Sequence, residues 1–252
     1  MTVPVYGQQM GFGSGVLIAS SKNSSGVITP RRFGILQDVQ LDFSADLKEL
    51  YGQGRYAIAL APGKTKIEIK SKFAEIRGAL FNDLYFGATT QTTGVTRYAD
   101  QEAHNIAATT PFIATVTNST TFVADQGVYY ALTGLPLTAV ASAPMVGQYS
   151  VAAGVYTFNT ADEGLGVYIS YTYTTATGLL IPISNIAMGT GPVFQIVLNQ
   201  PFDSRNGTFV FNNCRASKLS LPTKQDDFMI NELDFMPSAD PSGNIGTISL
   251  DL

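Results

Sequence analysis

Polar and apolar side chains alternate between residues 35 and 48, and this is the clearest pattern in the chain. Because successive side chains of a strand point to opposite faces, the pattern predicts a long β-strand with one face on a core and one in water. The predicted inner face holds Ile35, Val39, Leu41, Phe43, Ala45 and Leu47. The predicted outer face holds Asp38, Gln40, Asp42, Ser44 and Asp46.

The outer face of this strand carries three carboxylates and no cation. Such an acidic stripe suits a wall past which a polyanion must slide. An ordinary solvated face is the alternative interpretation. Calcium binding is a third, although carboxylates at alternate strand positions rarely converge on one ion without a loop.

Two further strands are predicted at about 55–61 and 64–72, separated by a turn at Pro62-Gly63. One face of the later strand is mostly basic and is made of Lys64, Lys66, Glu68, Lys70 and Lys72. This row could track phosphates, but Glu68 interrupts it and the acidic stripe is close in sequence. We therefore favour ion pairing across strands, within or between subunits.

A single helix is predicted from about Ser71 to Phe86, since apolar residues recur there at helical spacing. Ser71 is a candidate N-cap and Gly87 a candidate C-cap. Gly78 would then lie in the middle of the helix, where it permits close packing.

Short predicted strands with closely spaced turns fill residues 112–175, where charged residues are scarce. The strand at 167–174 is expected to pair with the one at 154–158. Long strands resume after residue 181. We predict a mainly β fold: a β-sandwich or barrel-like domain at 1–106 and 179–252 with one flanking helix, and an inserted small β-sandwich at 107–178.

Composition narrows the possible functions. Of 252 residues only 13% are charged, and the net charge of −4 argues against a grip on nucleic acid, which needs clustered Lys and Arg. The low charge suits surfaces buried between subunits. The N-terminal residues lack the regions of a secretory signal, and no apolar run approaches ~20 residues, so we expect a protein made and used in soluble form.

Catalytic motifs are weak. His104 and Cys214 are the only residues of their kinds, which leaves few options for a triad, a Cys–His pair or a zinc site. The glycines at 11–15 and 188–192 do not match a dinucleotide or phosphate loop. The carboxylate pairs Asp226-Asp227 and Glu232 with Asp234 are better explained as solvated faces than as a glycosidase pair. We expect no enzyme, no cofactor and no bound metal.

Several segments in order resemble the major tail tube proteins of tailed bacteriophages. They are the run DFSADLKELYGQ, the turn and strand APGKTKIEIK, the segment FAEIRGALFNDLYFG and the C-terminal KQDDFMINELDFMPSADPSGNIGTISLD. The resemblance implies six subunits in a ring whose inner strands form a continuous β-barrel, with rings stacked into a tube through which DNA is ejected. The strand at 35–48 would line the lumen through Asp38, Gln40, Asp42, Ser44 and Asp46.

The same resemblance implies the partners. They are further copies of the chain, the tape measure, tail terminator and baseplate proteins, and a sheath if the tail is contractile. DNA would pass without specific binding, and the protein would reside in the virion after assembly in the host cytoplasm. The alternative function is a β-rich fibre or decoration protein that binds a cell-surface glycan.

Overall fold

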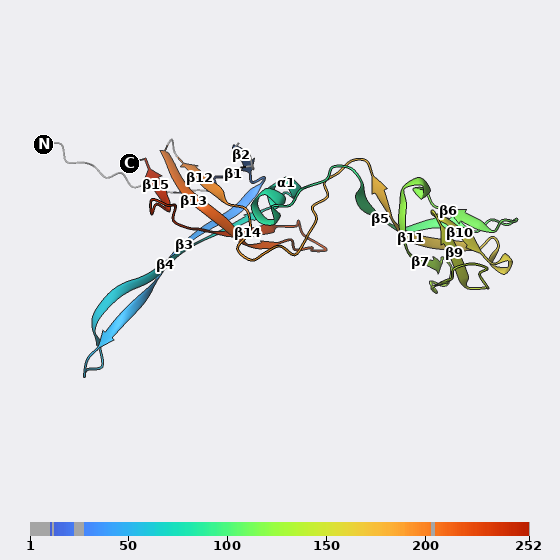
Figure 1. Ribbon diagram of the computed structural model, residues 1–252, viewed down its shortest axis with the longest axis horizontal. Coiled ribbons are helices and arrows are strands. Elements are labelled where there is room, and N and C mark those ends of the chain that lie inside the picture. Colours follow the sequence, from blue (N-terminus) through green and yellow to red (C-terminus); the bar gives the residue numbers. More distant parts are fainter. Residues whose placement is uncertain (1–10, 12, 23–27, 203–204, 252) are drawn as a thin grey trace. The chain divides into compact units, whose positions relative to one another are not determined.

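The computed structural model describes residues 11, 13–22, 28–202 and 205–251. It is mainly β, with 55% of residues in strands, an eight-stranded antiparallel sheet, two small sheets and one nine-residue helix. The chain divides into two compact units, residues 1–89 with 181–252 and residues 90–180. Figure 1 shows the elements of both units.

The first unit is built on the large sheet, whose strands run in the order β2-β1-β12-β13-β14-β4-β3. The strands are β1 (Val16–Lys22), β2 (Ile28–Arg32), β3 (Leu36–Tyr51), β4 (Ala57–Phe73), β12 (Phe194–Phe202), β13 (Arg205–Ser220), β14 (Asn231–Pro237) and β15 (Gly246–Leu250). β15 pairs with the first part of β13 and β14 with its last part, both on the edge opposite β12.

The core of this unit lies between one face of the sheet and the short helix. The helix comprises an α-helical turn, α1 (Gly78–Phe81), followed by a π-helical turn, η1 (Asn82–Phe86). The fully or nearly fully buried apolar side chains include Leu17, Ile69, Phe73, Leu80, Phe81, Leu84, Phe194, Ile196, Leu233 and Phe235. Phe33 meets Phe73 edge to face, with ring centroids 5.1 Å apart.

The predicted helix at 71–86 is wrong in its first half. β4 continues to Phe73, which pairs with Leu36 on one side and Asn231 on the other. Ser71 is buried within β4 and donates its hydroxyl to the Leu233 carbonyl at 2.7 Å, so it is not a helix cap. Gly78 begins the helix rather than interrupting it, and Gly87 ends it at φ 62°, as predicted.

The predicted turn at Pro62-Gly63 is also wrong, because β4 runs through both residues and the hairpin turns between Tyr51 and Ala57. Here β4 pairs with β3 alone, so the proline can lie where its missing N–H leaves no ladder bond unmade. A register shift between Ala45 and Leu47 of β3 accommodates Pro62-Gly63 of β4.

Ile35 does not share the inner face with Val39, contrary to the predicted pattern. It adopts φ 46° and is 64% exposed. A register shift follows at Leu36, and it is Leu36 that packs on the core instead.

The second unit is a small sandwich of two sheets, ordered β5-β11-β7 and β6-β10-β9-β8. Its strands are β5 (Val95–Asn105), β6 (Ile113–Thr115), β7 (Phe122–Tyr130), β8 (Thr138–Ala139), β9 (Gln148–Ala152), β10 (Val155–Phe158) and β11 (Gly166–Thr175). Single 3₁₀ turns, η2 (Ser119–Thr121) and η3 (Thr160–Asp162), connect some of them. Both sheets contribute to one core, which includes Tyr149, Tyr156, Val167, Ile169 and Tyr171.

The inserted unit begins earlier than the predicted residue 107. β5 pairs with β11 along nearly its whole length, so residues 95–105 belong with the insertion and the compact unit starts at residue 90. The expected pairing of the strands at 154–158 and 167–174 is absent: β10 pairs with β6 and β9, and β11 with β5 and β7.

Candidate functional site

The acidic stripe of β3 lies beside the basic row of β4. Asp38 is the register partner of Lys72, and Gln40 is the partner of Lys70. Further along, Asp42 is opposite Glu68 and Ser44 is opposite Lys66. The two predicted rows are therefore neighbours on one sheet surface.

The alternation of charge continues onto β14 and β13. Glu232 is the partner of Lys72, and Asp234 lies between Lys70 of β4 and Lys218 of β13. We call this surface the charged face. It holds five carboxylates and four lysines: Asp38, Asp42, Glu68, Glu232, Asp234, Lys66, Lys70, Lys72 and Lys218.

Ion pairs form within the charged face. Lys70 Nζ is 3.4 Å from Asp42 Oδ2 across the hairpin, and Lys218 Nζ is 2.9 Å from Glu232 Oε2 across β13 and β14. Lys66 also pairs with Glu68 along β4. The stripe is acidic on β3 alone; on the assembled sheet its neighbours nearly balance its charge, so the expectation of a wall of one sign needs correction.

Asp234 is a partly buried carboxylate of the charged face. Its Oδ1 is shielded from solvent and has no hydrogen-bond partner among the described residues. Burial raises the pKa of Asp234, and the nearby Glu232 adds to the effect. The hydrogen bond to Glu232 raises the pKa of Lys218, which keeps that ammonium charged.

The β3–β4 hairpin extends beyond the sheet as a two-stranded arm, which we define as residues 43–67 (Figure 1). β14 pairs with β4 only from Ile69 to Phe73, so the arm has no third strand among the residues that the structure describes. Asp46 and Lys64 lie on it and are exposed.

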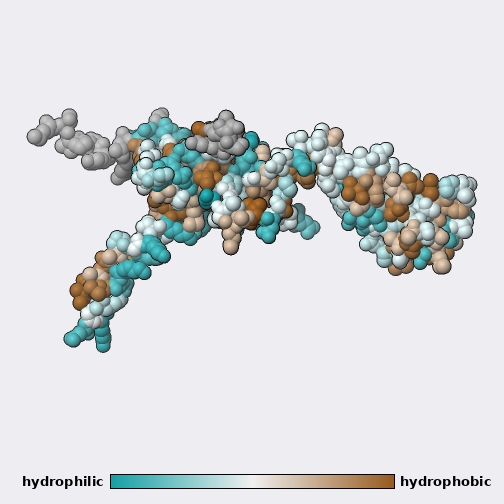
Figure 2. Space-filling model, viewed as in Figure 1, coloured by the Kyte–Doolittle hydropathy of each residue, from teal (hydrophilic) through white to brown (hydrophobic). Residues whose placement is uncertain are grey.

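Apolar side chains are exposed on both faces of the arm, and Figure 2 shows them gathered toward its end. Leu47 and Leu60 lie on one face, and Leu50 with Ala59 on the other. Leu47 is 61% exposed and Leu60 62%. A two-stranded hairpin is marginally stable alone in water, and exposed apolar patches mark interaction surfaces. The arm is thus the part of this unit that most needs a partner.

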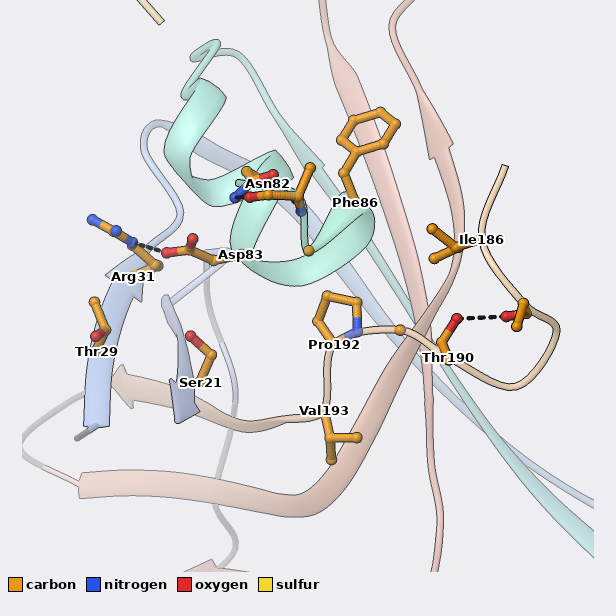
Figure 3. Close-up of a pocket in the computed structure, with 14 residues that line it drawn as sticks. Ser21, Thr29, Arg31, Asn82, Asp83, Phe86, Ile186, Thr190, Pro192 and Val193 are labelled. Atoms are coloured by element: carbon orange, nitrogen blue, oxygen red, sulfur yellow. Dashed lines mark hydrogen bonds and ion pairs between the residues drawn. The ribbon is translucent and has the colours of Figure 1, made fainter. Parts of the chain in front are cut away.

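A groove of about 840 Å³ lies between β1, β2, the helix and residues 186–193 (Figure 3). Arg31 Nε is 2.6 Å from Asp83 Oδ2 in its wall. Phe86, Ile186 and Pro192 supply apolar surface. None of the described residues that line it is a histidine or cysteine, and its one carboxylate, Asp83, is paired with Arg31.

His104 belongs to a hydrogen-bonded cluster in the second unit. Its Nε2 is 2.7 Å from Glu102 Oε1, and Glu102 also accepts hydrogen bonds from Thr117 and from Tyr171 Oη at 2.6 Å. Burial by itself would raise the pKa of Glu102, but these hydrogen bonds outweigh it and lower the pKa to about 2. The arrangement links β5 and β11 to the loop that follows β6.

The other residues that the sequence offered as candidates for catalysis or binding do not form one cluster. Cys214 is buried, and burial raises its thiol pKa to about 12, so it is not a reactive thiolate. Asp226 and Asp227 are exposed in a loop, where Asp227 pairs with Lys224 at 3.1 Å. Residues 188–192 lie beside the groove; of the glycine-rich 11–15, Phe12 is outside the described residues.

Among the described residues, no three His, Cys, Asp or Glu side chains are grouped to hold a metal ion. No helix in the described part of the chain is long and apolar enough to cross a membrane.

Sequence reasoning had not connected Lys218, Glu232 and Asp234 with the acidic stripe. Glu232 and Asp234 do alternate with the buried Asn231, Leu233 and Phe235, which identifies their face. Only the pairing of β14 with β4 places that face beside Lys70 and Lys72.

No known family model matches the chain, and no curated protein is significantly similar to it. The charged face and the arm are the features of the chain that point to a function.

Proposed function

We propose that the chain is a structural subunit that assembles with copies of itself into rings, and that the rings stack into a tube for the passage of DNA, as in the tailed-phage proteins that its sequence resembles. The observation that carries this proposal is the arm. It exposes apolar side chains on both faces, and over 43–67 neither outer strand edge pairs with another described strand. Strands buried on both faces have this composition, so the arm suits a site between other subunits.

The edges of the large sheet are the second observation that supports the proposal. β2 and β3 are its terminal strands, and each has one edge without a strand partner among the described residues. A contact that joins unlike edges of successive copies is heterologous, and such contacts close into rings when the rotation allows. Closure of a sheet in this way removes its exposed edges.

In this proposal the charged face lines the bore. Asp38, Gln40 and Asp42 of β3 would face the bore, together with Ser44 and Asp46 where β3 enters the arm. Its lysines lie beside carboxylates, and two of them form the cross-strand pairs with Asp42 and Glu232. DNA binding requires cations free to replace the counterions of the phosphates. A nearly balanced wall would neither hold nor strongly repel the duplex, which suits rapid passage.

The proposed location is the virion, and the proposed partners are copies of the chain together with tape measure and tube-end proteins. No enzymatic activity or cofactor is included. The proposal is tested by electron microscopy of the purified full chain, in which rings or tubes are expected. A stable monomer at high concentration, with no rings in the micrographs, would contradict it.

A matched variant separates assembly from folding. Ala45 and Thr65 are register partners, so an Asn-Gly turn can join them directly and remove the outer arm. The shortened chain should keep the β-rich circular dichroism of the full chain and fail to form tubes. Tubes of normal length from this variant would show that the arm is not the assembly element.

A further inference from the structure

The outer face of the β5-β11-β7 sheet in the second unit carries three tyrosines. Val167 and Ile169 are buried in the sandwich core, so Tyr168 between them points to the opposite face. The same alternation places Tyr129 of β7 and Tyr98 of β5 on that face; they are 40% and 57% exposed.

The pairing of the strands brings these rings into one surface. Tyr168 is the register partner of Tyr129 on one side and of Ala103 on the other. Thr172, four residues along β11, is the partner of Tyr98. At ~3.3 Å per residue, Tyr168 and Thr172 are about 13 Å apart along β11. The Tyr129–Tyr168 pair and the Thr172–Tyr98 pair are separated by this distance, so the surface is elongated along β11.

The sheet holds this surface rigidly from beneath. Tyr149 and Tyr156 of the facing sheet both donate hydrogen bonds to Asp125 of β7. Tyr171 of β11 donates to Glu102 of β5. The tyrosines of the outer face therefore stand on strands whose inner side chains are fixed by packing and hydrogen bonds.

The outer face is polar and almost without charge. Its other groups are small or carry hydroxyl and amide functions: Thr96, Ala103, Ala124, Gln126, Thr172 and Thr174. Within residues 90–180, all of which the structure describes, Asp100 is the one charged residue that the alternation places on this face. Tyr98 Oη donates to it at 3.4 Å.

We propose that this face binds a neutral polysaccharide. The apolar C–H face of a sugar ring stacks on an aromatic ring, and its hydroxyl groups hydrogen-bond to Thr, Gln and carboxylate groups. Rigid aromatic side chains with a few placed polar groups are the usual composition of a specific binding surface. The absence of a cation disfavours acidic polysaccharides and nucleic acids, which need positive charge.

This inference does not depend on the proposed tube. The surface lies wholly within the second unit, whereas assembly is assigned to the arm and the large sheet. Micrographs of the same preparation test the formation of rings, and the binding measurement tests the tyrosines. The proposed assembly and the proposed binding can therefore be refuted independently.

The test is native electrophoresis of the full chain through gels that contain dextran, galactomannan or a mixed-linkage β-glucan, with alginate as an acidic polymer. Retardation by at least one neutral polymer is expected. The variant Tyr129→Ala with Tyr168→Ala should weaken apparent binding roughly tenfold or more. Tyr129→Phe with Tyr168→Phe should keep most of it, since the rings remain.

Tyr85→Ala provides the matched control, because Tyr85 is a partly exposed tyrosine of the first unit. It should bind as the unaltered chain does. Should the double alanine variant fail to fold, Tyr98→Ala replaces it, since Tyr98 is more than half exposed. No retardation by any neutral polymer, equal retardation of the alanine variants, or retardation by alginate alone would each overturn the inference.

Discussion

Asp42 of β3 and Lys70 of β4 form an ion pair of 3.4 Å across the hairpin. The pair is diagonal, since the register partner of Asp42 is Glu68 and that of Lys70 is Gln40. Lys70 therefore pairs with a carboxylate of the acidic stripe on β3 although it is not directly opposite that carboxylate. The charge of the proposed bore depends on such pairs rather than on β3 alone.

Replacing Asp38, Asp42 and Asp46 with lysine should make the charged face strongly basic. Each substitution removes a carboxylate and adds a cation. Loss of Asp38 and Asp42 also takes a negative charge away from Lys72 and Lys70, which leaves these lysines available for phosphate contacts. Rings should still assemble, less well than the unaltered chain, and DNA should be retained and its delivery slowed. Filter binding of duplex DNA at increasing salt measures the effect, with a steep loss of binding expected as salt rises.

The control for this experiment changes three carboxylates elsewhere to lysine, namely exposed Glu163, Asp226 and Asp227. It has the same net charge and leaves the charged face intact. Equal DNA retention by the two variants would mean that net charge, and not this face, is responsible.

The arm can be tested by two point substitutions, Leu47→Asp and Leu60→Asp. Both side chains are more than half exposed in the subunit, so the free energy of unfolding should change by only about 0.5 kcal/mol per site. Assembly should be lost, because two charges would enter a buried apolar contact. Light scattering after size-exclusion chromatography measures this, and Lys48→Asp is the control on the same strand.

Removal of the second unit should leave assembly largely intact. The structure sets the cut after Thr89 and before Ile181, closed with a short Gly/Ser bridge, because deletion of 112–175 alone would leave β5 without β11 and β7. Rings of the shortened chain in micrographs are the expected result. Failure of residues 1–89 and 181–252 to fold together would show that the second unit is integral to the first.

Glu102 should make the second unit sensitive to acid. Its pKa is about 2 in the folded chain against an ordinary 4.5, so its ionised form is stabilised by folding. Ionised Glu102 therefore contributes fully to the free energy of unfolding above pH ~4.5, and this contribution is lost as the pH falls toward about 2. Urea unfolding followed by tyrosine fluorescence over this range measures the loss.

Glu102→Gln should flatten this acid dependence, since the amide does not titrate. Glu163→Gln, at an exposed position of the same unit, should leave it unchanged. An unaltered acid dependence in Glu102→Gln would assign the sensitivity to other carboxylates.

Local patterns predicted the kind of structure better than its boundaries. The alternation at Val39, Leu41 and Asp42 predicted both the strand and its faces, because side-chain direction along a strand depends only on position. Phe73 fits helical spacing equally well, and its strand conformation follows from pairing with Asn231, which is far away in the sequence. Pro62-Gly63 has the composition of a turn, yet an arm with free edges can hold both residues in a strand.

By itself the sequence determined that this is a β-rich chain with an inserted module, a helix ended by Gly87, and an acidic and a basic row on strand faces. These features depend on side-chain period and on local backbone preferences. The tertiary structure alone decided that Lys72 lies between Asp38 and Glu232, and that β3 and β4 continue into an unsupported arm. Cross-strand register depends on contacts between segments more than 150 residues apart, such as Ser71 with Leu233, and no local pattern specifies them.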